Sequence, residues 1–159
     1  MQIIRAIEEK ARLMPQRAAL SDGGRVITYA ELPSAIKQMA EKLAAADCKR
    51  LVIAGDNSIA WIISDLAALS CGVPVIPLPP FFTAAQRQGV LESSGATHIA
   101  LGTTLVPTGI HLQPALPEGT DKITYTSGST GTPKGVCLPQ DGLEAVATSI
   151  GGVLGAQHV

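Results

Sequence analysis

Aromatic residues are scarce in this chain, at 3% of its 159 residues, and neither sign of charge is in clear excess. Twelve Lys and Arg residues stand against thirteen Asp and Glu residues, which leaves a formal net charge of −1 at pH 7. Proteins that bind nucleic acids or anionic membranes concentrate positive charge on one surface. We therefore expect no nucleic-acid partner.

Cysteines are few, at Cys48, Cys71 and Cys137, and their number is odd. Their spacing does not match a metal site, and nothing at the N-terminus resembles a cleavable signal. The longest apolar run, near residues 59–71, is interrupted by Asp65 and is too short and too polar to span a bilayer. We expect a reducing, cytoplasmic compartment and no membrane span, with each cysteine a small buried hydrophobic residue rather than a nucleophile.

Apolar residues, in contrast, make up 46% of the chain, and its length is that of one domain able to bury roughly 70% of its unfolded surface. Short apolar runs alternate with stretches of helical periodicity, which is the order of a parallel α/β sheet. The predicted fold class is therefore α/β, a largely parallel sheet flanked by helices. The predicted elements are a helix over 2–13, a hairpin over 18–28, a helix capped by Thr28 to about 46, a strand over 50–55, a helix capped by Asn57 or Ser58 to 70, a strand over 73–78, a helix capped by Thr83 to about 94, strands over 97–101, 110–112, 122–126 and 136–138, and a helix over 140–153.

The stretch at 124–136, TYTSGSTGTPKGV, combines glycines, hydroxyl side chains and one lysine between two predicted strands. Glycines allow positive φ and let backbone N–H groups approach an anion, while hydroxyls and a lysine ammonium add donors. Pro133 fixes φ before the lysine and limits the freedom of the loop. This composition predicts a phosphate-binding loop. Its expected phosphate contacts are Thr126, Ser127, Gly128, Ser129, Thr130, Gly131, Thr132, Lys134 and Gly135.

Two common phosphate loops do not fit this stretch. The Walker pattern, counted from Gly128, requires glycine where the chain has Pro133 and Ser or Thr where it has Gly135. The dinucleotide pattern fails because Gly128 and Gly131 have the spacing G-x-x-G and open no clear βαβ unit. A flexible linker is also disfavoured, since a linker needs neither a Pro-Lys-Gly ending nor flanking strands.

Residues 125–135 closely resemble the signature loop of the adenylate-forming superfamily, which includes acyl-CoA synthetases, luciferases and the adenylation domains of peptide synthetases. Residues 28–32, TYAEL, and 67–79, AALSCGVPVIPLP, are similar to segments near the start of these enzymes. One departure is Gln140, where the family usually has a histidine. The resemblance implies that residues 1–159 are a single domain, the N-terminal portion of a large AMP-binding domain. The family's later motifs and its C-terminal lid domain have no counterpart here.

The resemblance also implies a function. In this family a carboxylate attacks the α-phosphate of ATP, and a thiol then takes the acyl group from the acyl-adenylate. It implies ATP and Mg²⁺ as cofactors, coenzyme A as co-substrate and a small carboxylic acid as partner, most simply in an acyl-CoA synthetase for a fatty or other acid. No residue is assigned a catalytic role, and the isolated chain is expected to be inactive and to self-associate. The alternatives are a non-catalytic nucleotide-binding or interaction module and a peptide-synthetase adenylation domain.

Overall fold

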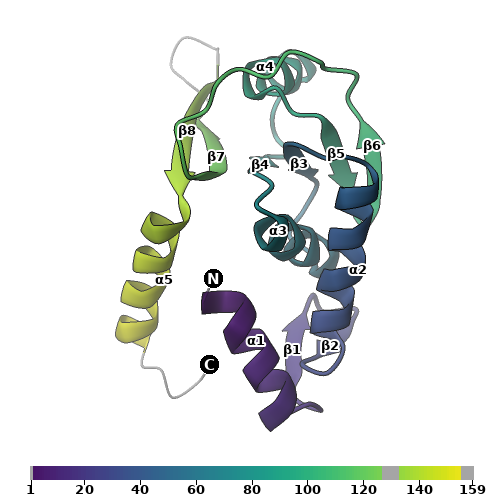
Figure 1. The fold of residues 1–159 in the computed structure, drawn as a ribbon, viewed down its shortest axis with the longest axis vertical. Coiled ribbons are helices and arrows are strands. Elements are labelled where there is room, and N and C mark those ends of the chain that lie inside the picture. The colour runs from purple at the N-terminus through teal and green to yellow at the C-terminus, as the bar shows by residue number, and fades with distance from the viewer. Residues whose placement is uncertain (1, 127–132, 155–159) are drawn as a thin grey trace.

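The computed structural model describes residues 2–126 and 133–154, with side chains described as far as Gly151 (Figure 1). Its elements divide between a small hairpin and a six-stranded sheet flanked by helices. In chain order they are α1 (Gln2–Leu13), β1 (Ala18–Ser21), β2 (Val26–Thr28), α2 (Leu32–Ala45), β3 (Leu51–Ala54), α3 (Ile59–Cys71), β4 (Val75–Leu78), α4 (Ala84–Ser94), β5 (His98–Leu101), β6 (Thr104–Pro107), β7 (Thr120–Thr126), β8 (Lys134–Pro139) and α5 (Gln140–Leu154).

The six-stranded sheet is parallel in its centre and antiparallel at both edges. Its strand order is β6-β5-β3-β4-β7-β8. Strand β3 pairs in parallel with both β4 and β5, and β4 pairs in parallel with β7. The edge strands β6 and β8 run antiparallel to their neighbours. The predicted α/β class with a largely parallel sheet is confirmed, and the complete sheet is mixed.

Helices cover both faces of this sheet, as Figure 1 shows for α2 and α3 on one side and α4 on the other. Side chains of β3 alternate between the two faces, as successive residues of any strand do. Leu51 and Ile53 pack in the cluster that contains α2 and α3, whereas Val52 packs with Val90 of α4. These β3 side chains are at most 1% exposed. A strand covered on both faces explains the continuous apolar run in the sequence.

Local signals fix the ends of the central helices as predicted. The Ser58 hydroxyl accepts a hydrogen bond from the backbone N–H of Trp61, which caps α3. Thr83 and Gln86 form a capping box at the start of α4. Gly72 and Gly95 end these two helices in the left-handed region, at φ values of 67° and 62°.

Two predictions about elements are corrected by the structure, and one strand was not predicted. Thr28 does not cap α2; the Glu31 carboxylate instead accepts hydrogen bonds from the backbone N–H and the hydroxyl of Thr28, and α2 begins at Leu32. No strand forms over 110–112. The strand that was not predicted is β6, which follows Gly102 and forms a tight hairpin with β5. Such a hairpin is set by a glycine at positive φ and does not need a long apolar run.

The cysteine prediction holds only in part. Cys48 is buried, and burial raises the pKa of its thiol, so it packs as a small hydrophobic residue. Cys137 is half-buried, but Cys71, the last residue of α3, is exposed. All three are free thiols.

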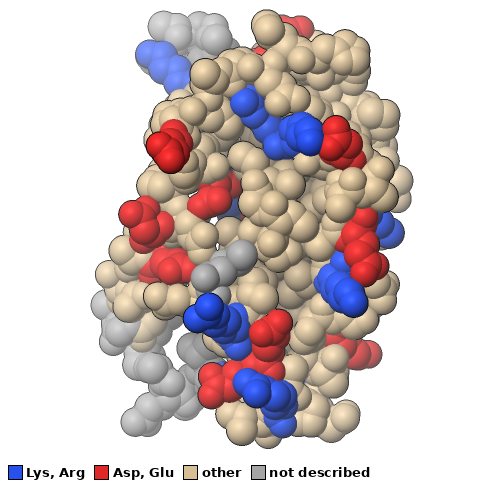
Figure 2. All heavy atoms as spheres, viewed as in Figure 1, with Lys and Arg blue, Asp and Glu red and all other residues tan. Residues whose placement is uncertain are grey.

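Figure 2 shows positive and negative side chains interspersed on the right and lower parts of the face that it displays, and several acidic groups along its left side. This pattern agrees with the near-balanced composition. Within residues 2–126 and 133–154, none of the helices is both long enough and apolar enough to cross a bilayer.

Candidate functional site

The predicted phosphate loop lies between β7 and β8, which are neighbouring antiparallel strands. Thr126 is the last residue of β7, Lys134 is the first of β8, and the two are paired in the antiparallel register. The expected contacts Ser127, Gly128, Ser129, Thr130, Gly131 and Thr132 lie outside the described residues. The structure therefore describes the base of the loop, through Thr126, Lys134 and Gly135.

The base of the loop stands at the carboxyl edge of the parallel strands. Strands β3, β4 and β7 run in the same direction, so Ala54, Leu78 and Thr126 end at one edge of the sheet. Gly55 follows β3 there with φ of 102°. Ligands of open α/β sheets bind in the crevice outside the carboxyl ends of the strands. A loop that extends from Thr126 is thus in the place where this architecture binds ligands.

Lys134 and Thr126 share one face of the sheet. Paired residues of an antiparallel ladder point to the same side, and successive residues alternate. Tyr125 contacts α4, so Thr126 and its partner Lys134 project from the opposite face. Lys134 is exposed, and in the described part of the chain its ammonium makes no ion pair. This places a free cation and a hydroxyl side by side at the mouth of the loop.

Gly135 does not have the positive φ that we expected, because it lies in β8 and is not among the glycines with positive φ. Its contact with phosphate stays a prediction. A Cβ at this position would lie 2.9 Å from Cζ and 3.1 Å from Oη of Tyr125, and 3.1 Å from Cγ2 of Ile123. The glycine is required because the Tyr125 ring crosses directly over the backbone of β8.

Tyr125 also connects the base of the loop to helix α4. Its hydroxyl lies 2.8 Å from the hydroxyl of Ser93, 32 residues earlier in the chain. The ring packs against the buried cluster that includes Val90 and Ile123. No pattern in the sequence pointed to Ser93, since one serine near a helix end is common and only the fold brings it to β7.

On the other face, Lys122 ties β7 to helix α3. Its ammonium lies 2.9 Å from the Asp65 carboxylate, and both side chains are mostly shielded, at 21% and 24% exposed. The ammonium also lies 5.8 Å from the centre of the Trp61 ring, within reach of a cation–π interaction. Strand β7 is therefore held from both faces of the sheet before the loop begins.

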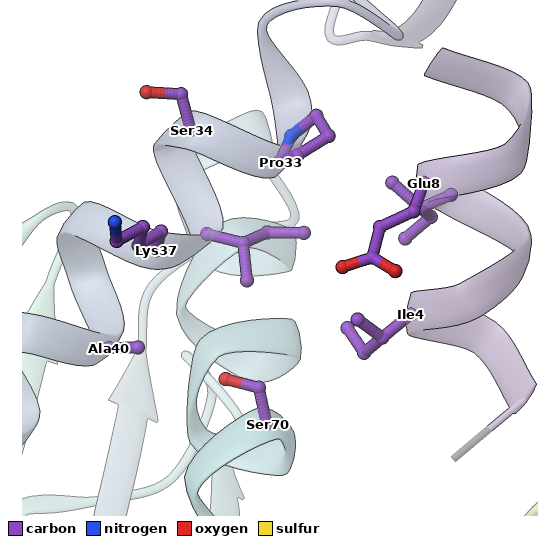
Figure 3. A pocket seen from close by; sticks show the side chains of 9 residues that line it. Ile4, Glu8, Pro33, Ser34, Lys37, Ala40 and Ser70 are labelled. Atoms are coloured by element: carbon purple, nitrogen blue, oxygen red, sulfur yellow. The ribbon is translucent and has the colours of Figure 1, made fainter. Parts of the chain in front are cut away.

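A separate apolar groove of about 460 Å³ lies between α1, α2 and the end of α3 (Figure 3). Ile4, Ile7 and Ile36 supply apolar lining, and the Glu8 carboxylate faces the groove from α1. None of its lining residues comes from β7 or β8, so this groove is not part of the loop site. In the described ranges, no group of three or more His, Cys, Asp or Glu side chains is arranged to hold a metal ion.

The sequence profile of the family described as "AMP-binding enzyme" matches residues 7–123. The match runs from within α1 to within β7, so it leaves out the predicted phosphate loop, β8 and α5.

Known relatives include two enzymes of different kinds. Phosphinothricin tripeptide synthetase PhsC of Streptomyces viridochromogenes is 29% identical over 90% of this chain and 16% of its own length. A feruloyl-CoA synthase of an Amycolatopsis species is 31% identical over 84% of this chain and 32% of its own length. This chain thus spans about a third or less of the length of these relatives.

Among solved structures, o-succinylbenzoate CoA synthetase of Bacillus subtilis bound to its acyl-adenylate intermediate is 26% identical, with a TM-score of 0.73. The similarity covers 94% of this chain and 46% of that one. Another structure of that enzyme, in complex with ATP and a magnesium ion, is 25% identical with a TM-score of 0.71 and covers 94% of this chain and 47% of that one.

Proposed function

The chain belongs to the AMP-binding enzyme family, and from this premise we propose that it is part of an ATP-dependent, AMP-forming ligase that activates a carboxylic acid as its acyl-adenylate. The observation that carries the proposal is the position of Lys134 and Thr126. They stand at the carboxyl edge of a sheet of this family, at the two ends of a Gly-, Ser- and Thr-rich segment.

In the proposed reaction a substrate carboxylate oxygen attacks the α-phosphate of ATP. The bond to the bridging oxygen of the β-phosphate breaks, and pyrophosphate leaves with its electron pair. Negative charge therefore grows on the leaving β- and γ-phosphates. The Lys134 ammonium and the hydroxyls of Ser129 and Thr130 are the groups that we propose to balance this charge, because preorganised donors stabilise charge as it develops.

Magnesium would accompany ATP. The hydroxyl and ammonium donors at the base of the loop suit phosphate oxygens, so we propose that this part of the chain holds the polyphosphate. A bound divalent ion supplies additional neutralisation of the same charge. The structure of the Bacillus subtilis synthetase with ATP and magnesium ion supports this choice of cofactor.

The second substrate is proposed to be coenzyme A. A feruloyl-CoA synthase and o-succinylbenzoate CoA synthetase are among the similar proteins, and both names specify a CoA acceptor. The similarity to phosphinothricin tripeptide synthetase favours a second candidate, a peptide-synthetase adenylation domain. Acyl transfer to free coenzyme A supports the first, and transfer only to a carrier-protein thiol supports the second.

We further propose that residues 1–159 are the N-terminal portion of a larger AMP-binding domain, because the chain covers under half of the solved relative. Exposed apolar side chains on β8 and α5, including Val136, Val146 and Ile150, would favour self-association of the chain on its own. A cytoplasmic location is proposed because ATP, coenzyme A and three free thiols suit a reducing compartment. Light scattering that showed a monomer at high concentration would count against self-association.

The phosphate-binding proposal is tested by calorimetric titration of ATP and of inorganic pyrophosphate. Replacing Lys134 with Ala should remove a charge-assisted contact worth about 1.5–3 kcal/mol, or roughly 10- to 150-fold in affinity, and less where water reaches the site. Lys37→Ala is the matched control, because the Lys37 side chain is 79% exposed on α2 and belongs to a different surface. Its affinity should equal that of the wild type.

Two results would contradict the proposal: no binding of either ligand by the wild type, or equal affinities of the wild type and Lys134→Ala. The reaction has its own assay, exchange of labelled pyrophosphate into ATP. In the longer protein this exchange should depend on an added carboxylic acid, and the isolated chain should show none.

A further inference from the structure

We propose that the hydrogen bond between the Tyr125 and Ser93 hydroxyls is a positioning contact, which sets where the nucleotide-binding loop leaves the sheet. Ser93 and Tyr125 are thus positioning residues that act through Thr126 and Lys134. The binding part of this inference rests on the proposed function, whereas its structural part does not.

The direction of the hydrogen bond follows from the surroundings of Ser93. The Ser93 hydroxyl lies 2.5 Å from the carbonyl oxygen of Gly89, an acceptor that can only receive a proton. A serine hydroxyl has one proton to donate, so it goes to Gly89. Ser93 then accepts the proton of Tyr125 across the 2.8 Å contact. Both hydroxyls have a defined role, and the tyrosine O–H has a fixed direction.

Helix α4 offers a firm anchor for this contact. The buried Arg50 guanidinium, 9% exposed, donates to the carbonyl oxygens of Ser94 and Pro114 at 2.6 Å each. Ser94 directly follows Ser93 in the last turn of α4 and is itself buried. The position of Ser93 is therefore set by Arg50, which directly precedes β3 in the centre of the sheet. Through its hydrogen bond to Ser93, Tyr125 fixes the end of β7 relative to α4.

The contact acts on the loop through two adjacent residues. Tyr125 directly precedes Thr126, the last residue of β7. It is also paired with Gly135, and its ring covers that glycine so closely that a Cβ would lie 2.9 Å from Cζ. Holding the ring thus holds both strands at the point where the loop begins and ends. Without the hydrogen bond to Ser93, the Tyr125 ring would still pack against the apolar cluster but would no longer be held through its hydroxyl.

The test uses variants that remove only hydroxyl groups. Tyr125→Phe and Ser93→Ala each remove one partner, and Ser93→Thr keeps the hydroxyl and should behave as the wild type. Tyr29→Phe is the matched control for tyrosine, since Tyr29 is the chain's other tyrosine and lies on the N-terminal side of α2. Ser149→Ala is the control for serine, because its hydroxyl also bonds a carbonyl one turn earlier, that of Ala145 at 3.0 Å.

Two measurements separate positioning from a general loss of stability. Amide hydrogen exchange should become about 2- to 10-fold faster at residues 124–126 and 134–136 in Tyr125→Phe and Ser93→Ala, the effect of one neutral hydrogen bond. Exchange at Val52 and Ile53 in β3 should not change. Affinity for ATP and inorganic pyrophosphate should fall by a similar factor, and the double variant should be no weaker than either single one.

Every outcome decides the proposal. Faster exchange at the loop base with weaker binding, restored by Ser93→Thr and absent in both controls, supports it. Unchanged exchange at the loop base overturns it, as does faster exchange with unchanged affinity in a wild type that binds. If the wild type binds neither ligand, the proposed function fails, and exchange at 124–126 and 134–136 still shows whether the hydroxyl pair holds the strand ends.

Discussion

Two regions of this chain bury their apolar side chains to very different extents. The body, residues 32–101, contains the strands and helices around β3, and Ile53 there is 1% exposed. The arm, residues 134–154, consists of β8 and α5, where Val136 is 48%, Val146 59% and Ile150 54% exposed. Figure 1 shows α5 extending along one side of the molecule toward the start of α1, away from the sheet.

The base of the predicted phosphate loop lies at the boundary between these two regions. Strand β7 joins them, and it is fixed to the body by Lys122 on one face and by Tyr125 on the other. The arm is joined to the sheet through β7, because among the described strands β8 is an edge strand that pairs with β7. The predicted phosphate loop thus lies where a well-packed strand meets a region with few buried contacts.

The largest expected difference comes from one substitution made in both regions. Ile53→Ala in β3 should lower the free energy of unfolding by about 2–5 kcal/mol, because it leaves a cavity in a packed core. Ile150→Ala in α5 should change it by less than about 0.5 kcal/mol, since the side chain is 54% exposed and alanine favours a helix. Urea unfolding followed by the fluorescence of Trp61, the chain's one tryptophan, measures both.

A loss of more than about 1 kcal/mol in the free energy of unfolding for Ile150→Ala would contradict the expected difference between the body and the arm. Such a loss would show that the Ile150 side chain is buried in solution, which self-association through the arm would cause. Repeating the measurement at several protein concentrations separates these cases, because the stability of an associating chain rises with concentration.

A smaller effect is expected at two glycines of the arm. Gly135→Ala should destabilise the chain by about 1–3 kcal/mol, because its Cβ would overlap the Tyr125 ring. Gly142→Ala should stabilise it by about 0.5–1 kcal/mol, since the nearest atom to a Cβ there is 3.8 Å away and alanine is the better helix former. If urea unfolding shows a loss of stability for Gly135→Ala and a gain for Gly142→Ala, the tightly packed part of the arm lies at Gly135, at the base of the loop. Equal effects would mean that Tyr125 does not occupy this position.

The sequence predicted the body better than the arm for a physical reason. Helix caps such as Ser58 and Thr83, and helix ends at Gly72 and Gly95, depend on neighbours in the sequence, and all were predictable. The side-chain contacts that hold β7 join Tyr125 to Ser93, 32 positions away, and Lys122 to Asp65, 57 positions away. No local sequence pattern marks such pairs.

The candidate site divides in the same way. Its composition predicts that the loop and Lys134 bind phosphate, because donors and glycines can be recognised from the residues alone, and this stays a prediction. The packing that requires a glycine at position 135 could not be found in this way, since it depends on the ring of Tyr125 on the paired strand. Thr28 was misassigned for a related reason: its side chain and backbone both serve the Glu31 carboxylate, so a capping-box spacing occurred without a Thr28 cap.

The smallest effect concerns Glu144, a carboxylate that links the arm to α1. Glu144 accepts hydrogen bonds from the Gln140 side chain at 2.8 Å and from the backbone N–H of Gln2 at 3.2 Å, and these hold its pKa below the ordinary value. A lowered pKa in the folded state means that the contact stabilises the chain above the ordinary carboxyl pKa. This stabilisation is lost as pH falls through the lowered pKa. The protection of the Gln2 amide, measured as its exchange rate relative to the intrinsic rate at the same pH, should therefore fall in acid while that of Ile53 does not. Glu144→Gln keeps an acceptor oxygen but cannot titrate, so its Gln2 amide should lose this pH dependence, and an unchanged pH profile would show that Glu144 does not connect the two regions.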